Sequence, residues 1–156
     1  MLSLSNAQRL KHHWLSHNVA FNDGVSADSL VEFERRCGVV LPPEMRDYFL
    51  VVNGMQEDET DDEMIRFWPL EEVKNLPAAA PDYATADYIQ SPQSIFLFAD
   101  YSLWAHAYGI RLSASEVGTN EIFIIGGDHP ILLFQSFSQF VESYLADKRS
   151  MFGKIR

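Results

Sequence analysis

Residues 33–54 read FERRCGVVLPPEMRDYFLVVNG and predict two helices joined by a short turn. Gly38 can adopt the left-handed conformation that commonly ends a helix. The pair Pro42-Pro43 suits the first turn of the next helix, because the amide that proline lacks would have no partner there. The residues of the pair Asn53-Gly54 both tolerate positive φ, and we expect the second helix to end there.

The segment upstream of residue 33 also has helical spacing. Ser26 is placed to cap the helix that reaches Gly38, and Ser5 and Gln8 have the spacing of a capping box for an earlier helix. Each helix carries an apolar stripe: Ala7, Leu10 and Trp14 in the first, Leu30, Phe33 and Cys37 in the second, and Met45, Phe49 and Val52 in the third. Three amphipathic helices are therefore expected in the first third of the chain.

Beyond Gly54 the apolar spacing changes to that of strands. Strands are expected over 64–68, 94–99, 103–112, 121–125 and 130–134. The second and third of these are expected to pair antiparallel, and Gly126-Gly127-Asp128 has the composition of a hairpin turn. The segment 76–92 contains three prolines and is expected to be mostly loop. Ser136 and Gln139 have the spacing of a second capping box, which opens a final helix.

Helices first, strands next and a helix at the end describe an α+β fold. We expect a single domain over residues 1–156, in which N-terminal helices pack on a mainly antiparallel twisted sheet that a C-terminal helix closes. A chain of 156 residues, 47% of them apolar, can bury a core without a disulfide or a structural metal. Its single cysteine, Cys37, excludes an internal disulfide and a cysteine-cluster zinc site, and we expect it to be a core residue.

The sequence contains none of the common catalytic or cofactor motifs. There is no Gly-x-Ser-x-Gly elbow, no P-loop and no dinucleotide fingerprint. An EF-hand is excluded because no glycine lies between Asp58 and Pro69. His13 and His17 are expected to be surface histidines, because no His-Glu-x-x-His pattern accompanies them. No enzymatic activity, cofactor or metal is therefore expected.

The formal net charge is −10 and is unevenly distributed. Residues 57–142 hold fifteen carboxylates against three basic residues. A net acidic protein lacks the basic face that nucleic acid or an anionic membrane attracts, so neither is expected as a direct partner. No apolar run reaches the roughly eighteen residues of a transmembrane helix, and charged residues interrupt residues 1–19, where a secretory signal would lie. We expect a cytoplasmic location.

The most distinctive polar segment is Glu57-Asp58-Glu59-Thr60-Asp61-Asp62-Glu63, the acidic loop. It is either a solvated loop or an electrostatic landing site for a basic partner. Tyr101 and Trp104 belong to an aromatic hairpin, and strand alternation could leave one face of this hairpin exposed. Exposed aromatic residues beside acidic loops are typical of protein-binding surfaces.

The stretch from Phe33 to Gly54 resembles the signature of the SUKH superfamily: a glutamate before a glycine, then Leu-Pro, a short helix and Asn-Gly. Three later blocks are similar to the family's first strand, central hairpin and last helix, namely residues 67–73, 98–108 and 136–141. The resemblance spans residues 26–146. Many members carry glycines in the central hairpin, where this sequence has Tyr101 to Trp104. The superfamily includes fungal regulators of cell-wall assembly and a large set of bacterial proteins.

The resemblance implies a non-enzymatic α+β domain that binds another protein. Bacterial members are chiefly immunity proteins, which neutralise secreted toxins by direct binding. Many such toxins are nucleases, which are basic because their substrates are phosphates. The implied partner is therefore a basic toxin domain such as a nuclease. The residues expected to contact it are Glu57, Asp58, Glu59, Asp61, Asp62, Glu63, Asp82, Asp87, Tyr101 and Trp104.

Two other functions stay open. One is a regulatory scaffold that binds an endogenous partner, as the fungal relatives do. The other is an enzyme or small-ligand domain that uses Asp100, His106 and Asp128. A concave site in which these groups converge, with strongly shifted pKa values, would indicate the latter.

Overall fold

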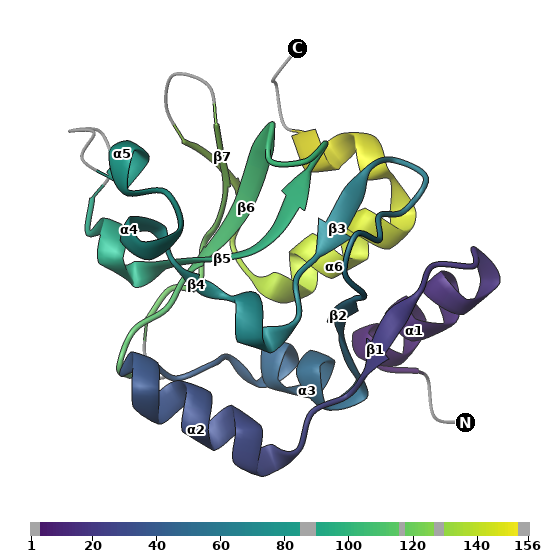
Figure 1. The fold of residues 1–156 in the computed structure, drawn as a ribbon, viewed down its shortest axis with the longest axis horizontal. Coiled ribbons are helices and arrows are strands. Elements are labelled where there is room, and N and C mark those ends of the chain that lie inside the picture. The colour runs from purple at the N-terminus through teal and green to yellow at the C-terminus, as the bar shows by residue number, and fades with distance from the viewer. Residues whose placement is uncertain (1–3, 85–89, 116–117, 127–129, 153–156) are drawn as a thin grey trace.

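The longer helices and the strands form the layers that the sequence pattern predicts (Figure 1). The computed structural model describes residues 4–84, 90–115, 118–126 and 130–152. The first third of the chain contains α1 (Asn6–Ser16), α2 (Ala27–Cys37) and α3 (Pro43–Val51). α6 (Phe137–Ala146) closes the fold and is followed by a 3-10 turn, Lys148–Phe152.

The main sheet has the strand order β3, β5, β6, β7, β8, and each neighbouring pair is antiparallel. Its strands are β3 (Ile65–Phe67), β5 (Ile95–Tyr101), β6 (His106–Arg111), β7 (Ile122–Ile125) and β8 (Ile131–Phe134). A short strand, β4 (Lys74–Asn75), also pairs with β5. The expected α+β fold, with a mainly antiparallel sheet and a closing helix, is confirmed.

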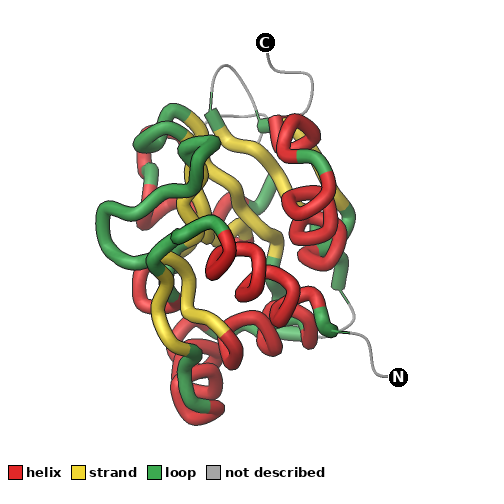
Figure 2. Tube along the Cα trace, turned by 90° about the vertical axis from the view of Figure 1, so that its right-hand side faces the viewer, coloured by secondary structure: helices red, strands yellow, loops and turns green. Residues whose placement is uncertain are grey.

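Aromatic rings fill the space between the helices and one face of the sheet. Trp14 of α1, Phe67 of β3 and Tyr144 of α6 are buried, and the Phe67 ring centroid lies 5.1 Å from that of Trp14 and 4.9 Å from that of Tyr144. Phe98 of β5 lies 5.0 Å from Phe140 of α6. Figure 2 shows the strands (yellow) with helices (red) beside and below them. Edge-to-face packing of these rings joins α1 and α6 to the sheet.

The other face of β5 is covered as well. Ile95 and Leu97 belong to an apolar cluster with Trp68 and Leu76, separate from the main core. Leu76 belongs to a short helix, α4 (Leu76–Ala79), which is followed by α5 (Pro81–Ala84). β5 is therefore buried on both faces, and its sequence shows no alternation of apolar and polar residues.

The predicted capping residues of α1 and α2 are confirmed. The Gln8 amide donates to the Ser5 hydroxyl at 3.2 Å, and the Ser5 amide donates to the Gln8 side chain at 3.2 Å. The Ser26 hydroxyl accepts from the amide of Ser29 at 3.2 Å. Gly38 ends α2 with a φ of +67°. The sequence predicts these helix ends correctly because each cap depends only on residues that lie within a few positions of one another.

The prediction that a helix ends at Asn53-Gly54 is wrong, because α3 ends at Val51. Residues Val52–Met55 form β2, which pairs antiparallel with β1 (Phe21–Asp23) in a separate two-stranded sheet. This pairing joins segments that are remote in sequence, so no local pattern signals it. Part of 76–92, expected to be mostly loop, is α4, α5 and a 3-10 turn at Pro92–Ser94.

Three smaller expectations also need correction or fall outside the described chain. Cys37 is half-buried rather than fully in the core. β6 begins at His106, because residues 102–105 form the turn that precedes it. Of the proposed turn 126–128, only Gly126 is described. Within the described ranges, no helix has the length and apolar character needed to cross a membrane.

We predict that Gly54→Ala destabilises the fold by about 3 kcal/mol or more, because Gly54 has positive φ and an added Cβ would lie 2.5 Å from the Trp68 backbone. Gly38→Ala is the matched control, with a similar φ and no atom within 4 Å of the added Cβ. It should cost about 1–2 kcal/mol. Urea denaturation measures both free energies of unfolding, and equal losses would show that the Trp68 backbone has room for a Cβ.

Candidate functional site

A hollow of about 490 Å³ opens between the acidic loop and the turn that joins β5 to β6. Its lining comes from three segments. The loop contributes Glu57, Asp58, Glu59 and Thr60, the region after it contributes Arg66 and Glu72, and the hairpin contributes Asp100, Leu103 and Trp104. We call it the acidic hollow, because five of these side chains are carboxylic acids and one is basic.

The turn between β5 and β6 presents two large apolar side chains beside this hollow. Ser102, Leu103 and Trp104 have φ values of 52°, 52° and 74°, so three successive residues other than glycine adopt the left-handed conformation. Leu103 is 82% exposed and Trp104 is 45% exposed. Such a conformation costs about 1–2 kcal/mol per residue, and backbone strain of this kind clusters at binding sites.

The Asp100 side chain holds the β5–β6 turn in place through hydrogen bonds. Its residue is 5% exposed, and its carboxylate accepts a hydrogen bond from the Trp68 indole N–H at 2.6 Å. Burial raises the pKa of this carboxyl, while hydrogen bonds from Trp68 and from the Trp104 backbone and the charge of Arg66 act in the opposite direction. The Trp68 and Trp104 rings pack together with centroids 5.0 Å apart. Asp100 therefore fixes both the turn and the indole that supports Trp104.

The one basic side chain among the described residues that line the hollow is already paired. Arg66 donates to both carboxylate oxygens of Glu72, at 2.9 and 3.1 Å, and also contacts the carbonyl oxygens of Met55 and Gln56. The hydrogen bond to Glu72 raises the pKa of Arg66 although burial opposes this shift. Glu72 balances the Arg66 charge, which leaves the other four carboxylates to set a negative potential.

The acidic loop divides into exposed and anchored residues. Glu57 and Asp58 are exposed at the hollow. Glu59 is half-buried, because its carboxylate accepts from the Ala20 amide at 2.6 Å and so ties the loop to the segment before β1. Of the loop residues expected to contact a partner, these three line the acidic hollow.

Asp61 lies in the interior and is only 6% exposed. Its carboxylate accepts from the Tyr144 hydroxyl at 2.5 Å and from the amides of Glu63 and Ile65, and lies 3.2 Å from the Lys148 ammonium. Burial and the Asp61 carboxylate raise the pKa of the Tyr144 hydroxyl, so it remains a donor. The structure therefore gives Asp61 an internal anchoring role, whereas the sequence pattern had grouped it with surface acids.

Asp62 and Glu63 are exposed but do not line the acidic hollow. The Lys148 ammonium donates to the Asp62 carboxylate at 2.9 Å, and this bond lowers the pKa of Asp62. The C-terminal turn thus neutralises part of the acidic loop, at a residue that does not line the hollow.

The remaining expected contact residues are dispersed. Asp82 is exposed in α5 and does not line the acidic hollow. Asp87 lies outside the described residues. Tyr101 is half-buried, with its ring 4.7 Å from that of Phe152. Of the two expected aromatic residues, only Trp104 therefore lines the hollow.

The residues considered for an enzymatic site do not converge. In the β5–β6 ladder Asp100 is opposite Ala107, and His106 is opposite Tyr101. Because successive strand residues face opposite sides of a sheet, Asp100 and His106 project to different faces. Asp128 is not among the described residues. Within the described residues, no group of three or more His, Cys, Asp or Glu side chains is arranged to hold a metal ion.

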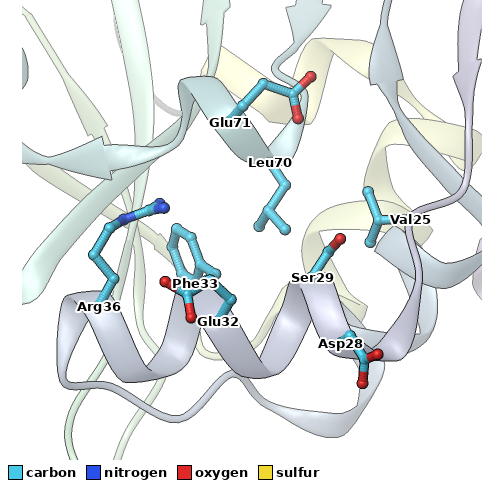
Figure 3. Close-up of a pocket in the computed structure, with 8 residues that line it drawn as sticks. All are labelled: Val25, Asp28, Ser29, Glu32, Phe33, Arg36, Leu70 and Glu71. Atoms are coloured by element: carbon cyan, nitrogen blue, oxygen red, sulfur yellow. The ribbon is translucent and has the colours of Figure 1, made fainter.

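A second hollow, of about 370 Å³, lies between α2 and the 3-10 turn Leu70–Glu72 (Figure 3). Phe33 and Leu70 form its apolar floor, with acidic side chains at its rim. The aromatic ring in this hollow already has a cation beside it, because the Arg36 guanidinium lies over the Phe33 ring, 5.7 Å from the ring centroid. This hollow combines both charge signs, whereas the acidic hollow is dominated by carboxylates.

Arg66, Glu72 and Leu103 are the hollow residues that the sequence pattern did not single out. Leu103 falls within an apolar stretch, and no glycine in residues 101–104 marks the turn. A turn built from left-handed residues other than glycine carries no compositional signal. Glu72 could have been found only through its partner Arg66, which requires knowing that β3 lies beside the turn.

A family model described as the SMI1 / KNR4 family (SUKH-1) matches residues 24–143 of the chain. The matched range runs from just before α2 into α6 and includes every described residue of the acidic hollow. A search of curated proteins found no match.

We predict that Asp61→Ala lowers the free energy of unfolding by about 3 kcal/mol, because it leaves Tyr144 and Lys148 without their buried partner. Asp62→Ala is the control, since Asp62 belongs to the same loop and the same lysine but its side chain is 68% exposed. It should cost less than about 1 kcal/mol. Urea denaturation at neutral pH distinguishes the two, and similar losses would contradict an interior role for Asp61.

Proposed function

This chain belongs to the SMI1/KNR4 family (SUKH-1), and from that premise we propose that it is a non-enzymatic binding domain that neutralises a cognate toxin through the acidic hollow. The partner is a basic toxin domain such as a nuclease, and the complex forms in the cytoplasm. Binding covers the toxin's active site, so no chemistry by this chain is involved.

The main support for this proposal is that exposed carboxylates and exposed apolar side chains line the same hollow. Glu57 and Asp58 lie at the same hollow as Leu103 and Trp104. Protein interfaces commonly place one or two large side chains at their centre and polar groups at the rim. The acidic hollow brings both kinds of side chain together.

The negative charge of this chain favours a partner with a positively charged surface. Nucleases carry basic surfaces because they bind phosphates, and an acidic surface attracts them over a long range. The formal net charge of −10 and the four carboxylates not balanced by Arg66 both favour such a partner. Electrostatic attraction of this kind mainly increases the association rate, and added salt weakens it.

The immediate experiment is co-expression. Cells are made to produce a toxin encoded next to this chain's gene, with and without the chain, and survival is measured. Survival only in the presence of the chain supports neutralisation. If the chain instead captures an endogenous non-toxin protein and gives no protection, the regulatory scaffold replaces the toxin-binding proposal.

For the isolated toxin we predict that Glu57→Gln with Asp58→Asn slows association about tenfold at low salt. Asn retains the positive φ of 61° at position 58, so the loop geometry is preserved. Asp47→Asn with Glu142→Gln removes the same charge from exposed positions outside the hollow and outside the acidic loop, and should change the rate by less than about twofold. Surface plasmon resonance measures both, and equal slowing by the two pairs would place the contact elsewhere.

A further inference from the structure

Trp104 is the exposed member of the tryptophan set. Trp14 and Trp68 are 0% and 3% exposed, whereas Trp104 is 45% exposed and lines the acidic hollow. Its backbone and its ring are both held, because the Trp104 amide hydrogen-bonds to Asp100 and the ring packs on Trp68. The hollow therefore offers a fixed aromatic surface next to carboxylates.

Other aromatic rings of this chain already carry a cation. Arg36 lies over Phe33 at 5.7 Å, Arg111 over Phe123 at 5.3 Å, and Lys148 over Tyr144 at 4.9 Å. In the described part of the chain no basic side chain occupies the corresponding position over Trp104. Indole is the aromatic side chain that attracts cations most strongly.

Among the described residues, the exposed carboxylates of the hollow, Glu57 and Asp58, also lack an ion-pair partner. The ion pairs found among residues 4–84, 90–115, 118–126 and 130–152 do not include Glu57 or Asp58. Arg66, the basic residue of the hollow, is occupied by Glu72. An incoming cation would therefore meet both an aromatic ring and available carboxylate oxygens.

We propose that the acidic hollow receives one arginine side chain of the protein partner, with the guanidinium against the Trp104 indole and hydrogen-bonded to the carboxylates of Glu57 and Asp58. This proposal rests on the proposed function and specifies how the partner is recognised. A guanidinium fits better than an ammonium, because it is planar, weakly hydrated and able to stack on a ring while donating to carboxylates in its own plane.

Asp100 adds to this recognition without direct contact. Its carboxylate lies at the hollow, and burial makes its ionised form costly, as the raised pKa shows. A cation in the hollow offsets this cost, because a nearby opposite charge favours the ionised form. The hollow is thus more favourable to a cation than the two exposed acids alone would make it.

The test uses the intact chain and three small probes: N-acetyl-arginine methylamide, its lysine counterpart and its citrulline counterpart, which has nearly the shape of arginine but no charge. The indole N–H signals are followed by ¹H–¹⁵N NMR at low salt. We expect the arginine probe to shift the Trp104 signal saturably, with a dissociation constant on the order of millimolar. The lysine probe should bind at least about threefold more weakly, and the citrulline probe should give no saturable shift.

Two comparisons test which side chains bind the guanidinium: one between two charge-removing double variants, and one between two substitutions of Trp104. Glu57→Gln with Asp58→Asn should weaken arginine binding about tenfold, and Asp47→Asn with Glu142→Gln should change it less than about twofold. Trp104→Phe should retain binding and Trp104→Leu should lose most of it, both measured by calorimetry because the reporter indole is absent. No Trp104 response up to roughly 50 mM arginine probe, or equal responses to arginine and citrulline, would overturn the proposal.

These results separate the arginine subsite from the proposed function. If the toxin binds Trp104→Leu as tightly as the unaltered chain and the arginine probe does not bind, toxin neutralisation stands and the subsite is wrong. If the arginine probe binds as described but co-expression gives no protection, the subsite stands and toxin neutralisation is wrong.

Discussion

The buried carboxylate of Asp61 joins parts of the chain that are remote in sequence. It accepts a hydrogen bond from the hydroxyl of Tyr144 in α6 and lies beside the ammonium of Lys148 in the C-terminal turn. The Trp14 indole N–H of α1 donates a hydrogen bond to the same Tyr144 hydroxyl at 3.1 Å. A buried charge that lost these partners would cost several kcal/mol, so this group fixes the path of the acidic loop from the inside. The positions of Glu57 and Asp58 at the hollow follow from that path, with Glu59 as a second attachment.

The sequence was informative where the interacting groups lie within a few residues of each other. The capping box of α1, the cap of α2 at Ser26 and the left-handed Gly38 are of this kind. It was uninformative where burial depends on remote segments. The β1–β2 pair and the covering of both faces of β5 by distant side chains are examples, because neither leaves a periodic pattern in the segment concerned.

The same distinction holds for the candidate site. The acidic loop has six carboxylates in seven residues and looks uniform in sequence. Its division into an interior residue, an anchored residue and exposed residues depends on Tyr144, Lys148 and Ala20, which lie far along the chain. The sequence named Trp104 together with the acids as an expected contact residue, but the exposure of Leu103 depends on a turn conformation that sequence composition does not indicate.

The turn at residues 102–104 also has an evolutionary meaning. Glycine in place of Ser102 would relieve part of the strain of the three left-handed residues and would keep Leu103 and Trp104, and many SUKH members carry glycines in this hairpin. A more stable turn would also be more pliant, so Leu103 and Trp104 would lose motional freedom when a partner bound, at a cost in affinity. Stability and preorganisation are therefore in conflict at this hairpin. Selection of this protein for heat resistance alone would favour glycine in the turn and would weaken recognition at the same step.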